Sequence, residues 1–250
     1  MQPLVIIPAR YDSTRFPGKP LALINDKPMI QHTYEQAIKT DYPVLVATDD
    51  ERIVKAVEEF GGKVVLTGEH SNGTERCREA AHIAESDHGM QFDVVINVQG
   101  DEPFIHPDQI KALFEVFGTD ENIDIATFGK RIKETEDLFS ANIVKVVRGK
   151  KRQALYFSRS VIPYCRDAFK DDWVEEHKYL KHIGMYAYRK EVLNQIVELP
   201  EGEIEKLESL EQLRWLEEGF TVIVLETTHE SIGIDTPDDL KRVNKQKNNA

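Results

Sequence analysis

The sequence contains very little cysteine. Its 250 residues include two cysteines, Cys77 and Cys165, which lie far apart and form no C-x-x-C pair. This scarcity argues against a disulfide framework and against a cysteine zinc site, and it is typical of a protein kept in a reducing compartment. We therefore expect a cytoplasmic protein.

Long apolar runs and an excess of basic residues are also lacking. No apolar stretch approaches the ~20 residues that a membrane-spanning helix needs, so no membrane insertion is expected. No basic stretch precedes the apolar run Leu4–Ile7, which we expect to be a first strand and not part of a signal peptide. The formal net charge of −12 argues against nucleic acid as a partner.

What the chain does contain is ordinary for a globular protein. Apolar residues make up 40% and charged residues 30% of the sequence. At 250 residues the chain fits one large domain or a domain with an insertion. We expect a single domain over residues 1–250, with a mixed lobe at about 130–220 that completes the site and contributes to subunit contact.

Short apolar runs alternate with amphipathic segments in the first half of the chain. Strands are expected at 4–7, 44–47, 64–66 and 94–98, with helical spacing between them, and this alternation predicts βαβ units and a mostly parallel sheet flanked by helices. Such sheets bind ligands at the carboxyl ends of their strands. After about residue 125 two strands follow each other without a helix, and helical spacing returns later, which predicts a smaller mixed α/β lobe. The expected elements of this lobe are strands at 143–147 and 153–157 and helices at 191–197 and 204–218.

Three cations follow the first expected strand in this acidic chain. Arg10, Arg15 and Lys19 share their loop with Pro17, Gly18 and Pro20. Glycine and proline shape a turn whose backbone N–H groups can face an anion, and the cations can clamp phosphate oxygens. The loop is not a P-loop, because proline follows Lys19 where a P-loop has serine or threonine. An anion site and a charged surface loop both fit these residues.

Two carboxylates are candidates for a magnesium site. Asp101 follows the apolar strand 94–98, and Asp235 directly precedes Thr236-Pro237, a helix start. Mg²⁺ takes oxygen ligands and keeps waters and substrate phosphates. We expect Asp101 to be a ligand and Glu102 only to cap the helix at Pro107. By itself Asp235 is a helix entry, and it would complete the site only if it met Asp101.

Other candidates carry two interpretations each. The turn Asn72-Gly73-Thr74 either contacts a nucleotide or caps a helix. His177 and His182, five residues apart, could form a metal pair, but we rather expect His182 alone to bind a ligand and His177 to lie at the surface. The stretch 208–216 is expected to be an amphipathic helix with leucines 210, 213 and 216 on its core face, which leaves Glu211 and Gln212 towards solvent.

Several motifs occur together in one order. They are "PARYDSTRFPGKPL", "GTER", "NVQGDEP", "NIVKVV", "ALYFSR", "HIGMYAY", "LESLEQLRWLEEG" and "IDTPDDL". From Ile6 to Leu240 the chain thereby resembles the 3-deoxy-manno-octulosonate cytidylyltransferase family. The resemblance implies a Rossmann-like α/β fold of the nucleotide-diphospho-sugar transferase type, with a smaller lobe that forms a homodimer. It also implies a reaction in which CTP and the acidic sugar Kdo give CMP-Kdo and diphosphate with Mg²⁺, for lipopolysaccharide synthesis.

The resemblance also implies roles for individual residues. The cations Arg10, Arg15 and Lys19 would hold the CTP phosphates, and Asp101 and Asp235 would bind magnesium. Catalysis would rest on Arg10, Lys19, Asp101 and Asp235. The nucleotide would be contacted by Gln99 and by Asn72, Gly73 and Thr74, with Arg76 in support. The sugar acid would be surrounded by Arg159, His182, Tyr186, Glu211 and Gln212, with Arg159 on its carboxylate.

One position departs from the family pattern. Asn72 stands where the family usually has serine, and asparagine is bulkier and has a different set of donors and acceptors. This leaves room for a related acidic sugar, such as 8-amino-Kdo or a nonulosonic acid. A binding protein without activity is a further alternative, although Lys19, Asp101 and Asp235 argue against it, since simple binding has less need of two separated carboxylates.

Overall fold

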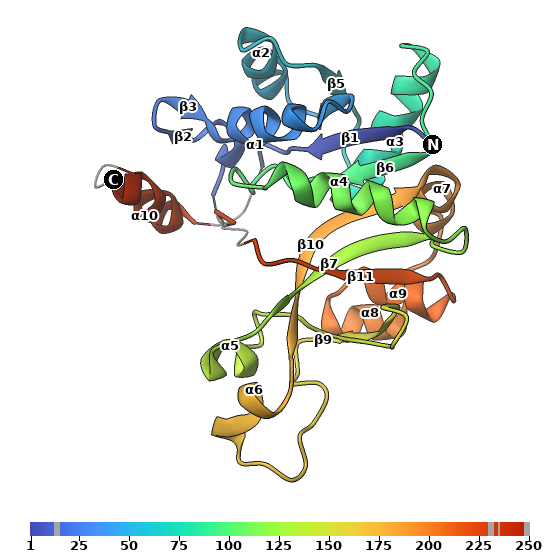
Figure 1. The fold of residues 1–250 in the computed structure, drawn as a ribbon. Coiled ribbons are helices and arrows are strands. Elements are labelled where there is room, and N and C mark those ends of the chain that lie inside the picture. The colour runs from blue at the N-terminus through green and yellow to red at the C-terminus, as the bar shows by residue number, and fades with distance from the viewer. Residues whose placement is uncertain (13–15, 230–232, 235, 248–250) are drawn as a thin grey trace. The chain divides into compact units, whose positions relative to one another are not determined.

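Apolar strands build the centre of each of two units in the chain. The structure is a computed structural model that describes residues 1–12, 16–229, 233–234 and 236–247 (Figure 1). One unit comprises Met1–Phe114 and Glu230–Ala250, and the other comprises Glu115–His229. The two units are described separately below.

The first unit contains a four-stranded parallel sheet. Its strands stand in the order β6-β1-β4-β5, and every pairing between them is parallel. All residues of β1, β4 and β6 are buried, as expected for strands covered on both faces. The predicted parallel sheet is therefore confirmed. The strands are β1 (Pro3–Pro8), β4 (Val44–Thr48), β5 (Val64–Leu66) and β6 (Val94–Asn97).

Helices lie between these strands in the sequence, as the alternation predicts. Asp50 caps α2 by accepting a hydrogen bond from the backbone N–H of Arg52. Gly61, with a φ of 77°, ends the same helix, because a left-handed residue after a helix favours glycine. The helices are α1 (Met29–Ala37), α2 (Glu51–Glu59), α3 (Gly73–Ser86), α4 (Pro107–Glu115) and α10 (Pro237–Lys247), with 3-10 turns at Lys19–Leu21 and Ile38–Thr40 and a hairpin of β2 (Leu23–Ile24) and β3 (Lys27–Pro28).

Helix α3 packs closely on the parallel sheet. It contacts β1, β4, β5 and β6, and it buries Cys77, Ala80, Ala81 and Ala84. These small side chains let the helix axis approach the strands. The start of α3 is thereby fixed relative to the carboxyl edge of the sheet, where β1 and β6 end.

The second unit contains a mixed sheet. In it β7 (Ile125–Arg131) pairs antiparallel with β10 (Leu180–Arg189) and parallel with β11 (Val222–Glu226). The strands β8 (Lys145–Arg148) and β9 (Ala154–Ser158) form an antiparallel pair with no helix between them, as predicted. The expected mixed α/β character of this part of the chain is confirmed.

One predicted helix of the second unit is wrong in its extent. The sequence predicts a single helix over 204–218, whereas the chain forms α8 (Glu203–Glu208) and α9 (Gln212–Glu217). Ser209 lies between them with a φ of 51°, and a left-handed residue cannot continue a right-handed helix. The remaining helices of this unit are α5 (Thr135–Phe139), α6 (Trp173–Glu176) and α7 (Lys190–Val197), with 3-10 turns at Val116–Gly118 and Lys170–Asp172.

The break at Ser209 also changes which side chains face the core. Gln212 and Trp215 are 5% and 1% exposed, and Leu213 is 1% exposed, while Leu216 is only half-buried. The expectation that Gln212 faces solvent and Leu216 the core is therefore wrong. Among the described residues, no helix is both long and apolar enough to cross a membrane.

Candidate active site

The carboxyl edge of the parallel sheet carries a cavity of about 500 Å³. Because the four strands of the first unit run in one direction, the loops after them meet at this edge. Three segments line the cavity: residues 8–10 with 19–20 after β1, residues 70–73 with Arg76 after β5, and residues 99–101 after β6. The site therefore lies where the alternating pattern of the sequence predicts it.

The cationic loop after β1 contributes two of its three cations to the cavity. Arg10 and Lys19 both line it. Arg15 lies outside the described residues. Gly18 turns the chain with a φ of 71°, and its N–H donates to the carbonyl oxygen of Tyr11 at 2.8 Å. This turn directs Lys19, whose side chain is 15% exposed, into the cavity.

Lys19 and Asp101 form an ion pair in the cavity. The distance from Lys19 Nζ to Asp101 Oδ2 is 2.6 Å, and the carboxylate is about one-third exposed, at 30%. A charge-assisted hydrogen bond of this length is among the stronger polar contacts in proteins. The sequence assigns these residues to phosphate and metal, and the structure brings them into direct contact.

The loop after β6 passes close to the end of β1. A Cβ atom on Gly100 would lie 3.0 Å from the carbonyl oxygen of Pro8, so glycine is needed for this approach. The backbone N–H of Ile234 donates to the carbonyl oxygen of Asp101 at 3.1 Å. The chain just before position 235 thus reaches the Asp101 loop, although Asp235 itself lies outside the described residues.

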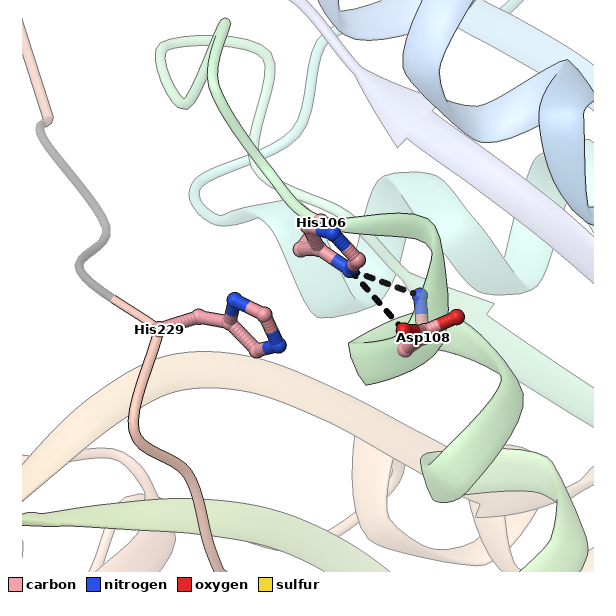
Figure 2. Close-up of side chains that lie close together, drawn as sticks. All are labelled: His106, Asp108 and His229. Atoms are coloured by element: carbon pink, nitrogen blue, oxygen red, sulfur yellow. Dashed lines mark hydrogen bonds and ion pairs between the residues drawn. The ribbon is translucent and has the colours of Figure 1, made fainter.

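Helix α4 follows the same loop, and its start is organised by His106. Figure 2 shows His106 beside Asp108: Nδ1 of His106 lies 3.3 Å from the backbone nitrogen and 3.4 Å from the carboxylate of Asp108. The backbone N–H of His106 donates in turn to Gln109 Oε1 at 3.3 Å. These contacts occupy the helix start at which the sequence predicts a cap from Glu102.

Asn72 caps helix α3. Its side-chain oxygen accepts a hydrogen bond from the backbone N–H of Glu75 at 2.8 Å, the usual contact of an N-cap residue. Asn72 and Gly73 also line the cavity, so both interpretations of this turn remain compatible with the structure. Thr74 is 3% exposed and is not among the residues that line the cavity.

Arg76 is buried beneath the cavity. It is 3% exposed and donates from Nη2 to Asp49 Oδ2 at 2.7 Å and from Nη1 to Thr67 Oγ1 at 2.7 Å. The carboxylate of Asp49 compensates its charge, as a buried guanidinium requires. Arg76 therefore joins the residues that follow β4 and β5 to α3. Its expected role in supporting the nucleotide contact stays a prediction.

Sequence reasoning missed His70 and Ser71 as lining residues. Both follow β5 and belong to the segment that faces the cavity. A loop after a short apolar strand is itself a signal in a parallel α/β fold, because every such loop reaches the carboxyl edge. In the loop after β5 the prediction reached Asn72, Gly73 and Thr74 but not the two residues just before them.

The predicted sugar-binding residues belong to the second unit. Arg159 follows β9 and donates to three backbone carbonyl groups: from Nε to Glu208 at 2.7 Å, from Nη1 to Ala141 at 3.2 Å and from Nη2 to Ser209 at 3.3 Å. A guanidinium has five N–H donors, so these contacts use three of them. The remaining two are the number that a carboxylate binds side by side.

His182, Tyr186 and Glu211 form a cluster within the second unit. The rings of His182 and Tyr186 are 5.3 Å apart, and Thr127 Oγ1 lies 3.1 Å from His182 Nε2. Desolvation lowers the pKa of His182 from 6.5 to about 3, so the ring is neutral near pH 7. Burial, followed by the nearby charge of Glu211, raises the pKa of Tyr186 well above 10.0.

The hydroxyl group of Tyr186 is buried without a hydrogen-bond partner among the described residues. A buried hydroxyl usually has one, and its absence marks a place where a ligand or water can bind. Four of the five predicted sugar-binding residues, Arg159, His182, Tyr186 and Glu211, thus carry polar atoms suited to such a ligand, while Gln212 is 5% exposed at the start of α9.

A parallel sheet with such a cavity at its carboxyl edge, lined by cations and a carboxylate, is typical of α/β proteins that bind phosphorylated ligands. Residues 4–232 match the family described as cytidylyltransferase. The chain belongs to this cytidylyltransferase family and is an enzyme of the nucleotidyltransferase class.

Proteins with similar sequences are also cytidylyltransferases by name. The chain is 53% identical over 245 residues to 3-deoxy-manno-octulosonate cytidylyltransferase of Bacteroides thetaiotaomicron, covering 96% of each sequence. It is 52% identical over 242 residues to the protein of the same name from Parabacteroides distasonis, covering 95% of this chain and 94% of the relative.

Solved structures resemble the chain over its whole length. The structure of CMP:2-keto-3-deoxy-manno-octonic acid synthetase complexed with CTP has a TM-score of 0.90 and 41% identity, and the match covers 100% of this chain and 99% of that one. A 4-diphosphocytidyl-2C-methyl-D-erythritol synthase from Anaerococcus prevotii, at 13% identity and a TM-score of 0.63, covers 99% of this chain and 96% of its own. That second likeness confirms the fold alone.

Proposed function

We propose that this enzyme transfers CMP from CTP to the anomeric hydroxyl group of Kdo, with release of diphosphate. The observation that carries the proposal is the cavity at the carboxyl edge of the first unit, where Arg10, Lys19, Gln99 and Asp101 converge. The relatives at 52–53% identity, which are named 3-deoxy-manno-octulosonate cytidylyltransferase, support Kdo as the acceptor and CTP as the donor.

Arg10 and Lys19 are placed to bind the triphosphate. Both cations line a cavity in a chain of net charge −12, so the positive charge is local to the site. Charge-assisted hydrogen bonds to phosphate oxygens neutralise the charge that develops on the departing diphosphate. We assign Arg15 the same role on the sequence alone.

The residues of the cavity fit a magnesium ion. Asp101 offers a partly exposed carboxylate beside the space that the phosphates would occupy. Oxygen donors with room for water and phosphate are the ligands Mg²⁺ prefers. Asp101 and Asp235 would hold the ion, which when bound supplies charge neutralisation at the α-phosphate.

Before it binds a cation, Asp101 has Lys19 as its partner at 2.6 Å. The ammonium group compensates the negative charge of this carboxylate at hydrogen-bond distance. Lys19 is thereby positioned within reach of both Asp101 and an incoming phosphate. One ammonium group with three N–H donors can bridge the two.

The second unit supplies residues for the acidic sugar. We assign the carboxylate of Kdo to Arg159, because two of its five donors remain for a ligand after its contacts with backbone carbonyls. The hydroxyl groups of the sugar can form hydrogen bonds with the neutral ring of His182 and with Tyr186, Glu211 and Gln212. A site built to bind several hydroxyl groups rejects analogues that lack them, because buried polar atoms are then left unpaired.

The reaction needs positioning and charge neutralisation. The anomeric hydroxyl of the sugar attacks the α-phosphorus in line with the departing diphosphate, so no covalent nucleophile of the protein is involved. Arg10 and Lys19 stabilise the negative charge on the leaving oxygens. We assign Gln99 and the turn at residues 72–73 to hold the nucleotide in the cavity.

Two properties of the assembled enzyme complete the proposal. We expect a homodimer in the cytoplasm, where CTP is available. Neither Cys77 nor Cys165 forms a disulfide in the structure, which suits a reducing compartment. Light scattering of the purified protein tests the dimer, because a monomeric mass over the working concentration range would contradict it.

Diphosphate release with separate acceptors tests the proposed function. The purified enzyme is incubated with CTP, Mg²⁺ and either Kdo, 8-amino-Kdo or sialic acid. The proposal predicts diphosphate release with Kdo at a kcat/KM well above that of the other acids. Release with sialic acid but not with Kdo would contradict it.

A further inference from the structure

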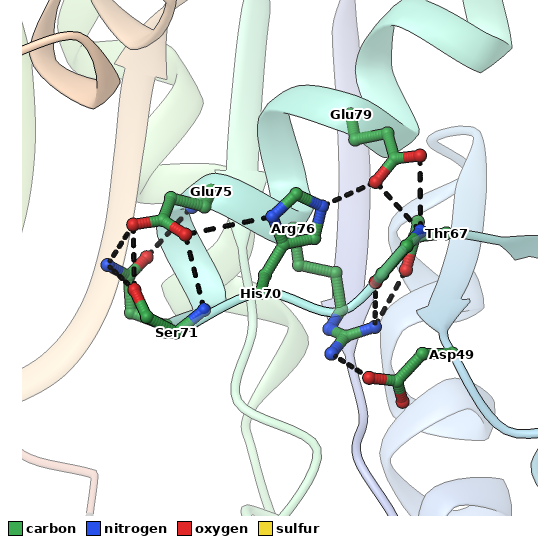
Figure 3. A network of polar contacts seen from close by, with 9 residues as sticks. Asp49, Thr67, His70, Ser71, Glu75, Arg76 and Glu79 are labelled. Atoms are coloured by element: carbon green, nitrogen blue, oxygen red, sulfur yellow. Dashed lines mark hydrogen bonds and ion pairs between the residues drawn. The ribbon is translucent and has the colours of Figure 1, made fainter.

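The loop over residues 67–72 is attached to helix α3 through five of its six residues, all except Glu69. This loop joins β5 to α3, and residues 70–72 of it line the cavity. Figure 3 shows that its partners are three residues of the first two turns of α3, namely Glu75, Arg76 and Glu79. The shape of this wall of the cavity therefore depends on side chains that stand behind it.

Glu79 holds the middle of the loop. Its two carboxylate oxygens accept the backbone N–H of Gly68 at 3.2 Å and 3.0 Å. Its Oε2 also makes a short hydrogen bond with Nε2 of His70. One carboxylate thus joins two loop residues, and one of them, His70, lines the cavity.

Glu75 holds the end of the loop. It accepts hydrogen bonds from the backbone N–H of Ser71 at 3.2 Å, from Ser71 Oγ at 2.8 Å and from Asn72 Nδ2 at 3.0 Å. Its Oε2 lies 3.7 Å from Nδ1 of His70. The imidazole ring of His70 is therefore placed between two carboxylates that are one helical turn apart.

Neither carboxylate lines the cavity. Glu75 and Glu79 act on it only through the loop, whereas His70, Ser71 and Asn72 are the residues that face a ligand. A loop that is already ordered spares the binding step the entropy of ordering it. If one carboxylate were removed, the loop would have to become ordered when the nucleotide binds, and binding would be weaker.

We propose that Glu79 is a positioning residue for nucleotide binding, which fixes the cavity wall through Gly68 and His70. This inference rests on the proposed function, because it takes the cavity to be the CTP site.

Glu79 is a better residue to mutate than its neighbours. Glu75 also belongs to the capped start of α3, and Arg76 is a buried ion-pair partner of Asp49, so changes at either residue would disturb the fold. The side chain of Glu79 is 36% exposed, and its removal leaves no deeply buried charge.

The test compares Glu79→Ala and Glu79→Gln with Glu69→Ala. Glu69 is an exposed glutamate of the same loop and serves as the matched control. In Glu79→Ala the dissociation constant and KM for CTP rise about tenfold, because the wall must be ordered on binding. The kcat value stays within about twofold of wild type, since Lys19 and Asp101 belong to other loops. Glu79→Gln lies closer to wild type, because its amide oxygen still accepts the Gly68 N–H.

Two further measurements separate positioning from general damage. Amide hydrogen exchange at Gly68 accelerates in Glu79→Ala and not in Glu69→Ala. In a His70→Ala background the Glu79→Ala change adds less to the CTP dissociation constant than it does alone, because the two residues act as one unit. If the effects of His70→Ala and Glu79→Ala on the CTP dissociation constant were fully additive, Glu79 would not act through His70.

The outcomes distinguish the two proposals. A wild-type protein that binds no CTP contradicts the proposed function and with it the role of Glu79. A wild-type protein that binds CTP, together with a Glu79→Ala variant of unchanged CTP affinity, overturns the inference alone. A fall in kcat that parallels a fall in melting temperature, with no change in KM, also overturns it.

Discussion

Asp101 and Lys19 place opposite charges side by side in the lining of the cavity. Lys19 Nζ and Asp101 Oδ2 lie 2.6 Å apart, and both side chains are partly buried. Each has a separate task in the proposed reaction, since the lysine neutralises phosphate charge and the carboxylate binds magnesium. A change at either residue is therefore expected to affect chemistry more than folding.

The first prediction concerns Asp101→Asn. Removal of the negative charge takes away the proposed metal ligand while keeping the size of the side chain, so kcat falls roughly 100-fold or more. The melting temperature stays close to that of wild type, because Asp101 is partly exposed. Steady-state kinetics and thermal unfolding check the two halves of this expectation. Activity equal to wild type would remove Asp101 from the metal site.

The second prediction concerns His182 and acid. Desolvation lowers the pKa of His182 from 6.5 to about 3 in the folded protein, so between these values only the unfolded chain takes up the proton. The contribution of neutral His182 to the free energy of unfolding is fully present above pH 6.5 and is lost as the pH falls towards 3. Lowering the pH from about 7 to about 5 therefore reduces the free energy of unfolding of the wild-type protein by about 2 kcal/mol through His182.

His182→Gln removes this titration, so the variant loses about 2 kcal/mol less than wild type over the same pH interval. Urea unfolding at the two pH values measures the difference. The control is His88→Gln, because His88 is exposed. If His182→Gln and His88→Gln showed the same pH dependence, the neutral state of the partly buried His182 would be refuted.

At the scale of elements, the turn before Lys19 depends on a single glycine. Gly18 has a φ of 71°, and a Cβ atom there would lie 3.1 Å from the ring of Tyr11. Gly18→Ala therefore strains the loop by about 1–2 kcal/mol and displaces Lys19, so the CTP dissociation constant rises about tenfold.

The matched control for this change is Gly219→Ala. Gly219 has a φ of 83°, belongs to the second unit, and has open space around its Cβ position. The same backbone strain arises there, so the melting temperature falls while CTP affinity stays at the wild-type value. Calorimetry with CTP and thermal unfolding report the two quantities. Equal CTP affinity in both variants would show that Gly18 does not shape the phosphate loop.

Ser209 provides a second test at this scale. It separates α8 from α9 with a φ of 51°, and its carbonyl oxygen accepts a hydrogen bond from Arg159. Ser209→Val is destabilising by about 1–2 kcal/mol, because a β-branched residue is disfavoured in the left-handed region. Ser209→Gly is at least as stable as wild type, since glycine adopts this conformation without strain. Chemical denaturation of both variants measures the order, and equal stability of the valine and glycine variants would contradict it.

The elements that the sequence predicts well are those with one strong signal. The apolar runs of β1, β4 and β6 identify buried parallel strands, and Gly61 marks the end of α2. The break at Ser209 carries no such signal, because serine is tolerated inside helices and the leucine spacing continues across it. The left-handed backbone of Ser209, which ends α8, is visible only in the folded chain.

For the whole molecule, the sequence predicts which residues line the cavity better than it predicts the contacts that hold its loops in place. Arg10, Lys19 and Asp101 could be predicted because strand ends in a parallel sheet meet at one edge. The attachment of residues 67–72 to α3 could not, because Glu75 and Glu79 follow the same spacing as solvent-facing residues of any surface helix. Their partners Gly68 and His70 are backbone and loop groups whose positions arise only in the folded chain.

Product formation from CTP and Kdo tests the central claim most directly. The enzyme is mixed with CTP, Mg²⁺ and Kdo, and phosphorus NMR follows the nucleotide while mass spectrometry identifies the sugar product. We predict that CMP-Kdo and diphosphate form in equal amounts and that Asp101→Asn forms neither at a comparable rate. Diphosphate without a sugar nucleotide, or a sugar nucleotide formed only from a different acid, would contradict the account.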